Sequence, residues 1–285
     1  MRLTFLGTGT STGVPVIGCR CAVCRSDDAR DRRLRTSALV ETEPNGEGGL
    51  RFVIDTGPDF RAQALRAHLT RLDAVLYTHS HFDHVAGLDD LRPFLFENRT
   101  PLPCYAAPET AAVLRRTYPY AWGESDYPGV PVLRLEEIGG PPGAPAPFRV
   151  GSRYGSGASV DVVPIPAWHG TFPVLGFRVG ALAYLTDVSA VPDASLALLG
   201  GLDVLVLDAL RHEPHPTHFS IGEAVAMAAR IGARRTFFVH MTHTVAHAAE
   251  SARLPEGVFF AHDGLVVEVR EERSKVREEI PAPDA

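Results

Sequence analysis

Cysteine and long apolar runs are both scarce in this sequence. Four cysteines in 285 residues do not make the disulfide framework of a small secreted domain. No apolar run approaches the about 20 residues that a membrane-spanning helix requires. The opening residues, Met1 to Gly7, lack the apolar stretch and the small-residue cleavage site of a signal peptide. We therefore expect a cytoplasmic protein without a membrane partner.

Positive charge is not in excess either, since 28 lysines and arginines face 34 aspartates and glutamates, for a net charge of -6. A protein that coats nucleic acid needs a broad basic surface, so we do not expect a nucleic-acid partner. A small phosphate substrate fits this charge, because a bound metal ion supplies positive charge locally. The local basic run from Arg30 to Arg35 is typical of a solvated face. The sequence leaves open whether it guides an anionic substrate.

Apolar residues make up 45% of the chain, enough for a sizeable core. Short apolar runs rich in branched residues alternate with stretches of helical spacing. The runs predict strands over residues 2–6, 37–41, 50–54, 74–77, 160–165, 175–179, 182–186, 204–207 and 236–239. The helical stretches cover residues 59–68, 109–118, 220–231 and 245–254. This mixture predicts a layered α/β architecture with partly antiparallel sheets.

Turn residues predict how several of these elements are joined. Residues 45–49 are expected to form a hairpin turn. Residues 259–260 and 265–269 are expected to pair in a last hairpin, and the segment 139–157, rich in proline, glycine and alanine, in a surface loop. We expect one domain over residues 1–270, followed by a charged, disordered tail over residues 271–285.

Three histidines and an aspartate lie directly after the predicted strand 74–77. They are His79, His81, Asp83 and His84. A lone histidine is usually a core or surface residue, but this cluster indicates metal, because imidazole and carboxylate suit divalent ions such as zinc. His79 and His81 point to one side of an extended segment, and Asp83 and His84 can bind a second ion. Two ions about 3.5 to 4 Å apart can share one hydroxide, which is a nucleophile at neutral pH.

The pattern His-x-His-x-Asp-His after a strand resembles the signature of the metallo-β-lactamase superfamily, and the resemblance extends from Met1 to Arg270. It implies an αββα sandwich of two mixed β-sheets flanked by helices. It also implies a metal-dependent hydrolase with two Zn²⁺ or Mn²⁺ ions in the active site. Further metal-competent residues lie at the ends of predicted strands: Asp55, His169, Asp187, Asp208 and His240.

The resemblance also implies which residues hold which ion. It assigns His79, His81 and His169 to one ion and Asp83, His84 and His240 to the other, with Asp187 bridging the two. Asp55 is similar to an upstream aspartate of the superfamily that orients the ligands. Asp208 matches no ligand and receives no role.

Three of the four cysteines lie in the glycine-bounded segment 18–24, and their spacing indicates a soft-metal site rather than a disulfide. Three thiolates need one more donor to complete a structural zinc site. Within the superfamily, the PhnP-type phosphodiesterases carry such a trio and a histidine three residues after the last catalytic ligand. This resemblance implies one structural Zn²⁺ held by Cys19, Cys21, Cys24 and His243. The alternative is three free thiols beside a surface histidine.

His218 stands just before a predicted helix, where the PhnP-type enzymes have a histidine that resembles a general acid. An imidazole suits proton transfer because its ordinary pKa lies near neutrality. The alternative is a solvent-exposed loop histidine. The catalytic residues are then His218, Asp83 and Asp55. The loop Gly7 to Gly13 resembles a phosphate cradle but lacks a P-loop ending, so we expect it to form a wall of the site.

The function predicted in this way is hydrolysis of a small cyclic phosphodiester of the phosphoribosyl 1,2-cyclic phosphate type. Two alternatives stay within the superfamily: RNA processing, and hydrolysis of a thioester or lactone. A third is a non-catalytic pathway protein resembling pyrroloquinoline-quinone biosynthesis protein B. A homodimer is common among the relatives, and the sequence leaves the oligomeric state open.

Overall fold

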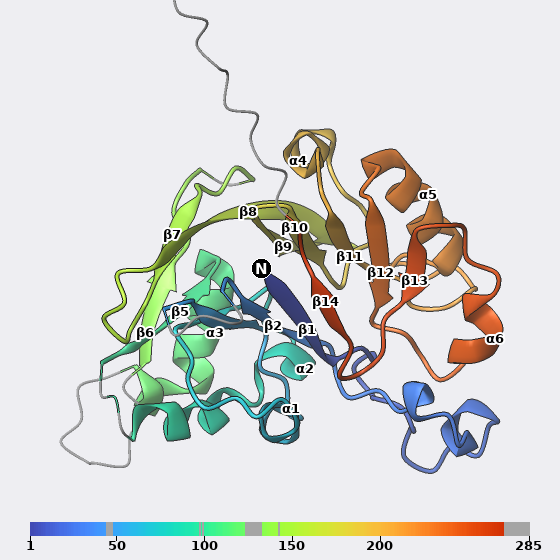
Figure 1. Ribbon diagram of the computed structural model, residues 1–285, viewed down its shortest axis with the longest axis horizontal. Helices are drawn as coiled ribbons and strands as arrows, with labels where there is room; N and C mark the ends of the chain where they lie inside the picture. The colour runs from blue at the N-terminus through green and yellow to red at the C-terminus, as the bar shows by residue number, and fades with distance from the viewer. Residues whose placement is uncertain (44–47, 97, 99, 123–132, 142, 271–285) are drawn as a thin grey trace, which may run out of the picture.

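The chain is described by a computed structural model over residues 1–43, 48–96, 98, 100–122, 133–141 and 143–270 (Figure 1). Most of the predicted turn at 45–49 and the whole predicted tail at 271–285 lie outside the described residues. No helix in the described ranges is long and apolar enough to cross a membrane.

Two sheets of seven strands each form the centre of the molecule. The first sheet contains, in spatial order, β14 (Val266–Glu268), β1 (Arg2–Gly7), β2 (Ser37–Glu41), β3 (Arg51–Ile54), β4 (Ala74–Leu76), β5 (Leu102–Ala106) and β6 (Leu133–Glu137). The second contains β13 (Val258–Phe260), β12 (Arg235–Val239), β11 (Val204–Asp208), β10 (Leu182–Leu185), β9 (Phe172–Val179), β8 (Ser159–His169) and β7 (Phe148–Gly151). Each sheet mixes antiparallel pairs such as β1–β2 with parallel pairs such as β3–β4 and β10–β11.

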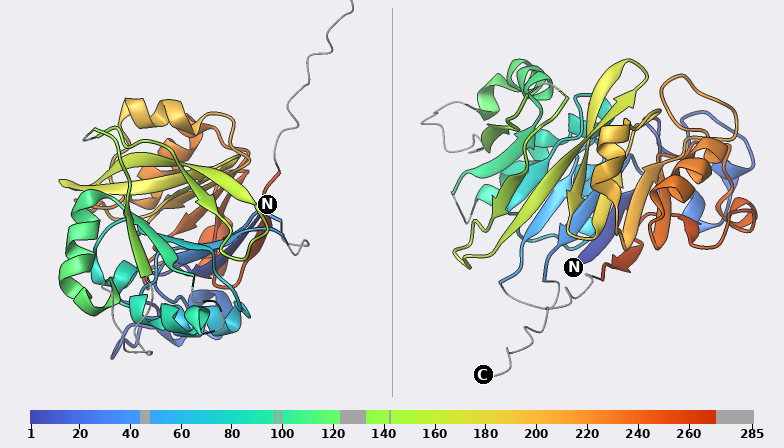
Figure 2. Two further views of the ribbon diagram at one scale, coloured as in Figure 1. Left: turned by 90° about the vertical axis from the view of Figure 1, so that its left-hand side faces the viewer. Right: turned by 90° about the horizontal axis from the view of Figure 1, so that it is seen from above.

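Helices cover the outer faces of both sheets, as the two views in Figure 2 show. The α-helices are α1 (Phe60–Arg66), α2 (Phe82–Val85), α3 (Pro108–Thr117), α4 (Asp193–Leu196), α5 (Ile221–Ile231) and α6 (His247–Ser251). Short 3-10 helices are η1 (Val23–Arg25), η2 (Ala29–Asp31), η3 (Leu88–Leu95), η4 (Pro119–Ala121) and η5 (Ala197–Leu199). The longest α-helices have clear end signals: α3 begins with Pro108, and Ser220 and Glu223 form a capping box on α5.

Three apolar clusters hold these layers together. One lies between the sheets and contains Phe5 and Phe52 of the first sheet beside Phe177 and Tyr184 of the second. A second packs the outer face of the second sheet against α5, and a third packs the outer face of the first sheet against α1 and α3. The result is the αββα sandwich that the sequence predicted.

Two connections differ from the prediction. The segment 139–157 contains the strand β7, which pairs with β8 at the edge of the second sheet. The strands β13 and β14 do not form a hairpin: β13 pairs with β12 in the second sheet, and β14 pairs with β1 in the first. The turn at Asp263 and Gly264 therefore carries the chain from one sheet to the other. A local turn signal does not reveal this, because the partner strands are distant in sequence.

Candidate metal centres

Polar side chains gather where strands of both sheets end. In the first sheet Asp55 follows β3 and His79 follows β4; in the second, His169 ends β8, Asp187 follows β10 and His240 follows β12. Asp55, Asp187 and His240 have φ angles of 62°, 56° and 64°, a left-handed conformation that is uncommon outside glycine. Such backbone strain is concentrated at functional sites.

Four buried side chains form the first cluster: Asp83, His84, Asp187 and His240 offer ligand atoms within 4.8 Å of one another. His84 Nε2 lies 3.2 Å from Oδ2 of Asp83 and 3.2 Å from Oδ2 of Asp187. His240 Nδ1 lies 3.1 Å from the same Asp187 oxygen. Burial opposes a charge on His84, but the carboxylates of Asp187, Asp55 and Asp83 outweigh it and raise the pKa of His84. The electrostatics at this point favour a cation.

Asp187 also belongs to a second cluster, with His79 and His81. His79 Nε2 lies 4.0 Å from Oδ1 of Asp187, so the two oxygens of this carboxylate face different clusters. The ring of His169 lies beside both histidines, with its centroid 5.8 Å from that of His79 and 5.1 Å from that of His81. The structure thus brings His79 and His81 together with Asp187, whereas the ligand atom of His169 groups with those of Asp187 and His218. The binding of ions by these side chains stays a prediction.

The donor atoms fit a pair of divalent ions. Nε2 of His79 is buried and has no hydrogen-bond partner among the residues described, whereas buried polar atoms are normally paired. Nε2 of His84 is also buried and lies within ion-pair distance of Asp83 and Asp187, but it is not aligned for a hydrogen bond with either carboxylate. The opposite ring nitrogens are held, His84 Nδ1 at 2.7 Å by Asp55 Oδ2 and His79 Nδ1 at 3.0 Å by Thr78 Oγ1. The Thr78 hydroxyl in turn donates to Asp55. Metal-binding histidines usually have such a second partner, which fixes the ring.

Glycine allows close packing behind Asp83. A Cβ at Gly57 would lie 2.0 Å from the carbonyl oxygen of Asp83, and a Cβ at Gly87 would lie 2.1 Å from that of Gly57. Thr56 N donates to His84 O at 2.8 Å, and Gly87 N donates to Thr56 O at 2.8 Å. These contacts fix α2, and with it the two ligand candidates that this short helix carries.

His218 lies beside both clusters, with its ring 4.5 Å from that of His169 and 4.8 Å from that of His240. Its Nδ1 lies 3.0 Å from Oδ2 of Asp208, a buried residue at the end of β11. Burial lowers the pKa of His218, but the Asp208 carboxylate outweighs burial and raises it above the ordinary value. This imidazole is therefore able to hold a proton next to the clusters. The sequence noted Asp208 only as a polar residue at a strand end.

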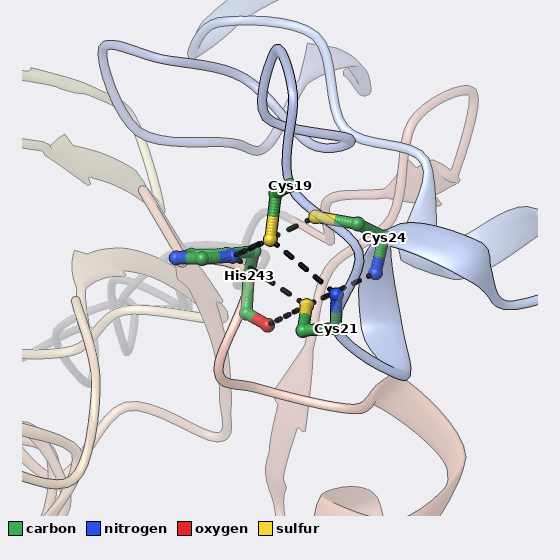
Figure 3. Close-up of side chains that lie close together, drawn as sticks. All are labelled: Cys19, Cys21, Cys24 and His243. Carbon is green, nitrogen blue, oxygen red and sulfur yellow. Dashed lines mark hydrogen bonds between the residues drawn. The ribbon is translucent and has the colours of Figure 1, made fainter.

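The cysteine segment closes on His243, which follows β12 (Figure 3). Nδ1 of His243 lies 3.2, 3.5 and 3.6 Å from the Sγ atoms of Cys19, Cys21 and Cys24. Tetrahedral zinc, with bonds of about 2.3 Å to sulfur and about 2.0 to 2.1 Å to nitrogen, gives an S···N edge of about 3.6 Å. The three S···N distances are close to this edge, and all four donor atoms lie within 4.8 Å of one another.

The thiols in this cluster differ in how readily they ionise. The backbone N–H of Cys24 donates to the sulfur of Cys21 and lowers the pKa of Cys21 to about 6. Burial, together with the neighbouring Cys19 and Cys21, raises the pKa of Cys24 to about 11. Three thiolates this close together need a cation to neutralise them. All four cysteines are free, and Cys104 is buried in β5.

The basic run is not simply a solvated face, which corrects the interpretation from sequence. Arg33 is buried and pairs with Asp31 at 3.2 Å. Its guanidinium also donates to the carbonyl oxygens of Thr242 at 3.0 Å and Val245 at 2.7 Å, on either side of His243. A buried charge is tolerated when it is paired and hydrogen-bonded. Arg33 thereby fastens the N-terminal segment to the segment that carries His243.

The glycine-rich loop after β1 is bonded to the residue that follows His240, and its role as a wall of the site stays a prediction. Thr10 N donates to Met241 O at 3.2 Å, and Met241, the residue after His240, donates back to Thr8 O at 3.1 Å. The N–H groups of Thr10 and Gly13 both donate to backbone carbonyls. These amides are therefore not free to cradle a phosphate.

The family model described as "Beta-lactamase superfamily domain" matches residues 50–241. A crystal structure described as a new diphosphatase from the PhnP family is similar, with a TM-score of 0.81 and 42% identity, covering 94% of this chain and 97% of that one.

Two curated relatives are also similar. An octanoyltransferase of Porphyromonas gingivalis is 37% identical over 280 residues; the match covers 98% of this chain and 54% of that protein, so the chain spans about half its length. A coenzyme PQQ synthesis protein B of Methylobacterium nodulans is 28% identical over 94% of this chain and 99% of that protein.

Proposed function

Because this chain belongs to the metallo-β-lactamase superfamily of metal-dependent hydrolases, we propose that it cleaves a P–O bond in a small phosphodiester with two metal ions. The leading substrate is a cyclic phosphodiester of the phosphoribosyl 1,2-cyclic phosphate type. The position of Asp187 supports this most strongly, because its two carboxylate oxygens face two clusters of histidines. A bridging carboxylate is what a dinuclear site needs.

In this proposal the residues around Asp187 have different roles in binding the two ions. Two divalent ions, Zn²⁺ or Mn²⁺, would activate water at neutral pH and neutralise phosphate oxygens. The first ion would be held by His79, His81 and His169 and the second by Asp83, His84 and His240, with Asp187 serving both. Asp55 keeps His84 in its orientation and, through Thr78, that of His79.

In this proposal His218 donates the proton to the leaving group. With Nδ1 held by Asp208, the imidazole can present Nε2 to the leaving oxygen and donate the proton there. The cysteine cluster has a different task, because a structural Zn²⁺ held by Cys19, Cys21, Cys24 and His243 would fix the N-terminal segment beside the loop that follows His240.

Two of the similar proteins suggest other candidate substrates. The PhnP-family structure is described as a diphosphatase, so a P–O–P bond is a further candidate target. The relative named octanoyltransferase favours an acyl group, so a thioester is the second candidate substrate. The relation to coenzyme PQQ synthesis protein B keeps a non-catalytic role as a further alternative, although the full set of ligand candidates present here favours catalysis.

A substrate panel tests the proposal. The purified protein, loaded with Zn²⁺ or Mn²⁺, is assayed on bis(p-nitrophenyl) phosphate, a ribose cyclic phosphodiester, a diphosphate ester and an octanoyl thioester. Asp187→Asn is the matched control, because asparagine tolerates the left-handed backbone at this position but lacks the bridging charge. We expect hydrolysis of the phosphodiesters by the wild type and its loss in Asp187→Asn. Turnover of the thioester alone would overturn the proposal, as would full activity in the variant.

A further inference from the structure

His81 differs from the other candidate ligands of its cluster. Its side chain is exposed, whereas His79 and His169 are buried. The ring nitrogen of His79 that faces away from the cluster is held by Thr78, and Nδ1 of His169 lies 2.7 Å from the carbonyl oxygen of Thr217. Within the described part of the chain, no hydrogen bond holds a ring nitrogen of His81. Hydrogen bonding therefore does not fix this imidazole.

An aromatic ring contacts His81 where a hydrogen bond is lacking. Phe172, the half-buried first residue of β9, stacks on His81 with ring centroids 5.5 Å apart and planes 17° from parallel. The same ring meets His79 with centroids 6.3 Å apart and planes at 63°. In the β8–β9 hairpin, Phe172 is paired in register with His169. One phenylalanine thus contacts or pairs with all three histidines that the proposed function assigns to one ion.

The stacked geometry has a direct consequence for metal binding. An exposed imidazole that no hydrogen bond holds loses side-chain rotational freedom when it binds an ion, and that loss weakens the affinity. A flat ring lying against the imidazole restricts this rotation before the ion arrives. The β8–β9 hairpin is a rigid support for that ring, because its strands pair continuously from Val163 to His169.

We propose that Phe172 is a positioning residue for the ion at His79, His81 and His169, and that its ring pre-orients His81 for binding. The inference rests on the proposed dinuclear function. Aromatic pairs contribute about 0.5 to 1.5 kcal/mol beyond area burial, which corresponds to roughly a 2- to 10-fold change in affinity. Removing the stack should weaken one active-site ion by this factor and leave the other two ions of the chain unchanged.

Three variants of the full-length protein separate stacking from packing. Phe172→Leu keeps an apolar side chain but removes the flat ring, and Phe172→Tyr keeps the ring. Phe259→Leu is the control, because Phe259 on β13 is an exposed ring that stacks on Phe237 with centroids 5.3 Å apart and, among the described residues, makes no ring contact with a candidate ligand. Each protein is loaded with Zn²⁺ and challenged with increasing chelator, and retained metal is counted by mass spectrometry. The visible spectrum after Co²⁺ loading reports the ligand geometry.

We expect Phe172→Leu to release one ion at roughly 2- to 10-fold lower chelator concentration, with an altered Co²⁺ spectrum, while Phe172→Tyr and Phe259→Leu match the wild type. Equal retention by Phe172→Leu and the wild type overturns the inference and leaves the dinuclear proposal intact. Equal losses in Phe172→Leu and Phe259→Leu overturn it too, because they reveal a general packing effect. A wild type that holds only one ion, at the cysteines, overturns the proposed function and this inference with it.

Discussion

Replacing Asp208 with asparagine should slow hydrolysis of phosphodiesters whose leaving group must be protonated and spare those whose leaving group departs as a stable anion. The Asp208 carboxylate lies 3.0 Å from Nδ1 of His218 and raises the pKa of that imidazole. Asparagine fills nearly the same volume in this buried position but carries no charge. His218 then loses the negative charge that raises its pKa, although the asparagine oxygen can still accept from Nδ1.

The size of the effect is bounded by what a general acid contributes. Proton transfer by a positioned side chain accounts for roughly 10²- to 10⁴-fold in rate, so His218→Ala should lower kcat by about that factor on a diester with an alkyl leaving group. Asp208→Asn acts through His218 and cannot cost more. The double variant should be no slower than His218→Ala alone, because residues that act as a unit are not additive.

The assay compares two substrates on the same enzymes. Bis(p-nitrophenyl) phosphate releases p-nitrophenolate, which needs no proton, so both variants should keep most of their activity on it. Asp73→Asn is the control for loss of a buried carboxylate, because Asp73 accepts from Arg51 N and Arg153 N, each at 2.9 Å, and has no contact with His218. Equal rate losses on the two substrates in Asp208→Asn would refute the assignment of general acid catalysis to His218.

Three further substitutions test how the sites are built. Cys21→Ser should remove one zinc per chain and lower the melting temperature. The difference in melting temperature from the wild type should vanish once both proteins are stripped of metal. An unchanged metal count would contradict the structural site. Arg33→Met leaves Asp31 buried without its cation and should cost about 3 to 5 kcal/mol in unfolding free energy, measured by urea denaturation; a cost near zero would mean that this pair holds nothing in place. Gly57→Ala places a Cβ 2.0 Å from the Asp83 carbonyl oxygen and should cost about 1 to 3 kcal/mol and reduce activity; a variant as stable and active as the wild type would disprove the tight packing behind α2.

Much of the candidate site could be predicted because its residues follow a local rule. Several ligand candidates come at or just after the end of an apolar strand, so the sequence shows both the strand and the polar residue that the sheet places at its edge. His79, His169 and His240 are of this kind. Their resemblance to the superfamily then supplied the grouping around Asp187. In the structure Asp187 belongs to every one of these groups, but His169 lies with His218 rather than with His79 and His81.

What the sequence could not reveal depends on distant partners. The role of Asp208 appears only when His218, in the loop that follows, is seen to fold back against it. Arg33 lies in a run of charged residues, and only the carbonyl oxygens near His243 explain its burial. The strands β13 and β14 were expected to pair because they are close in sequence, yet each completes a different sheet. In all three cases the deciding contact is made by tertiary structure.

Anomalous diffraction from crystals of the protein grown in metal-replete medium, recorded at the metal's absorption edge, tests the central claim most directly. The account predicts two peaks about 3.5 to 4 Å apart with Asp187 between them, and a third peak enclosed by Cys19, Cys21, Cys24 and His243. A single peak at the cysteines, with none beside Asp187, would contradict it.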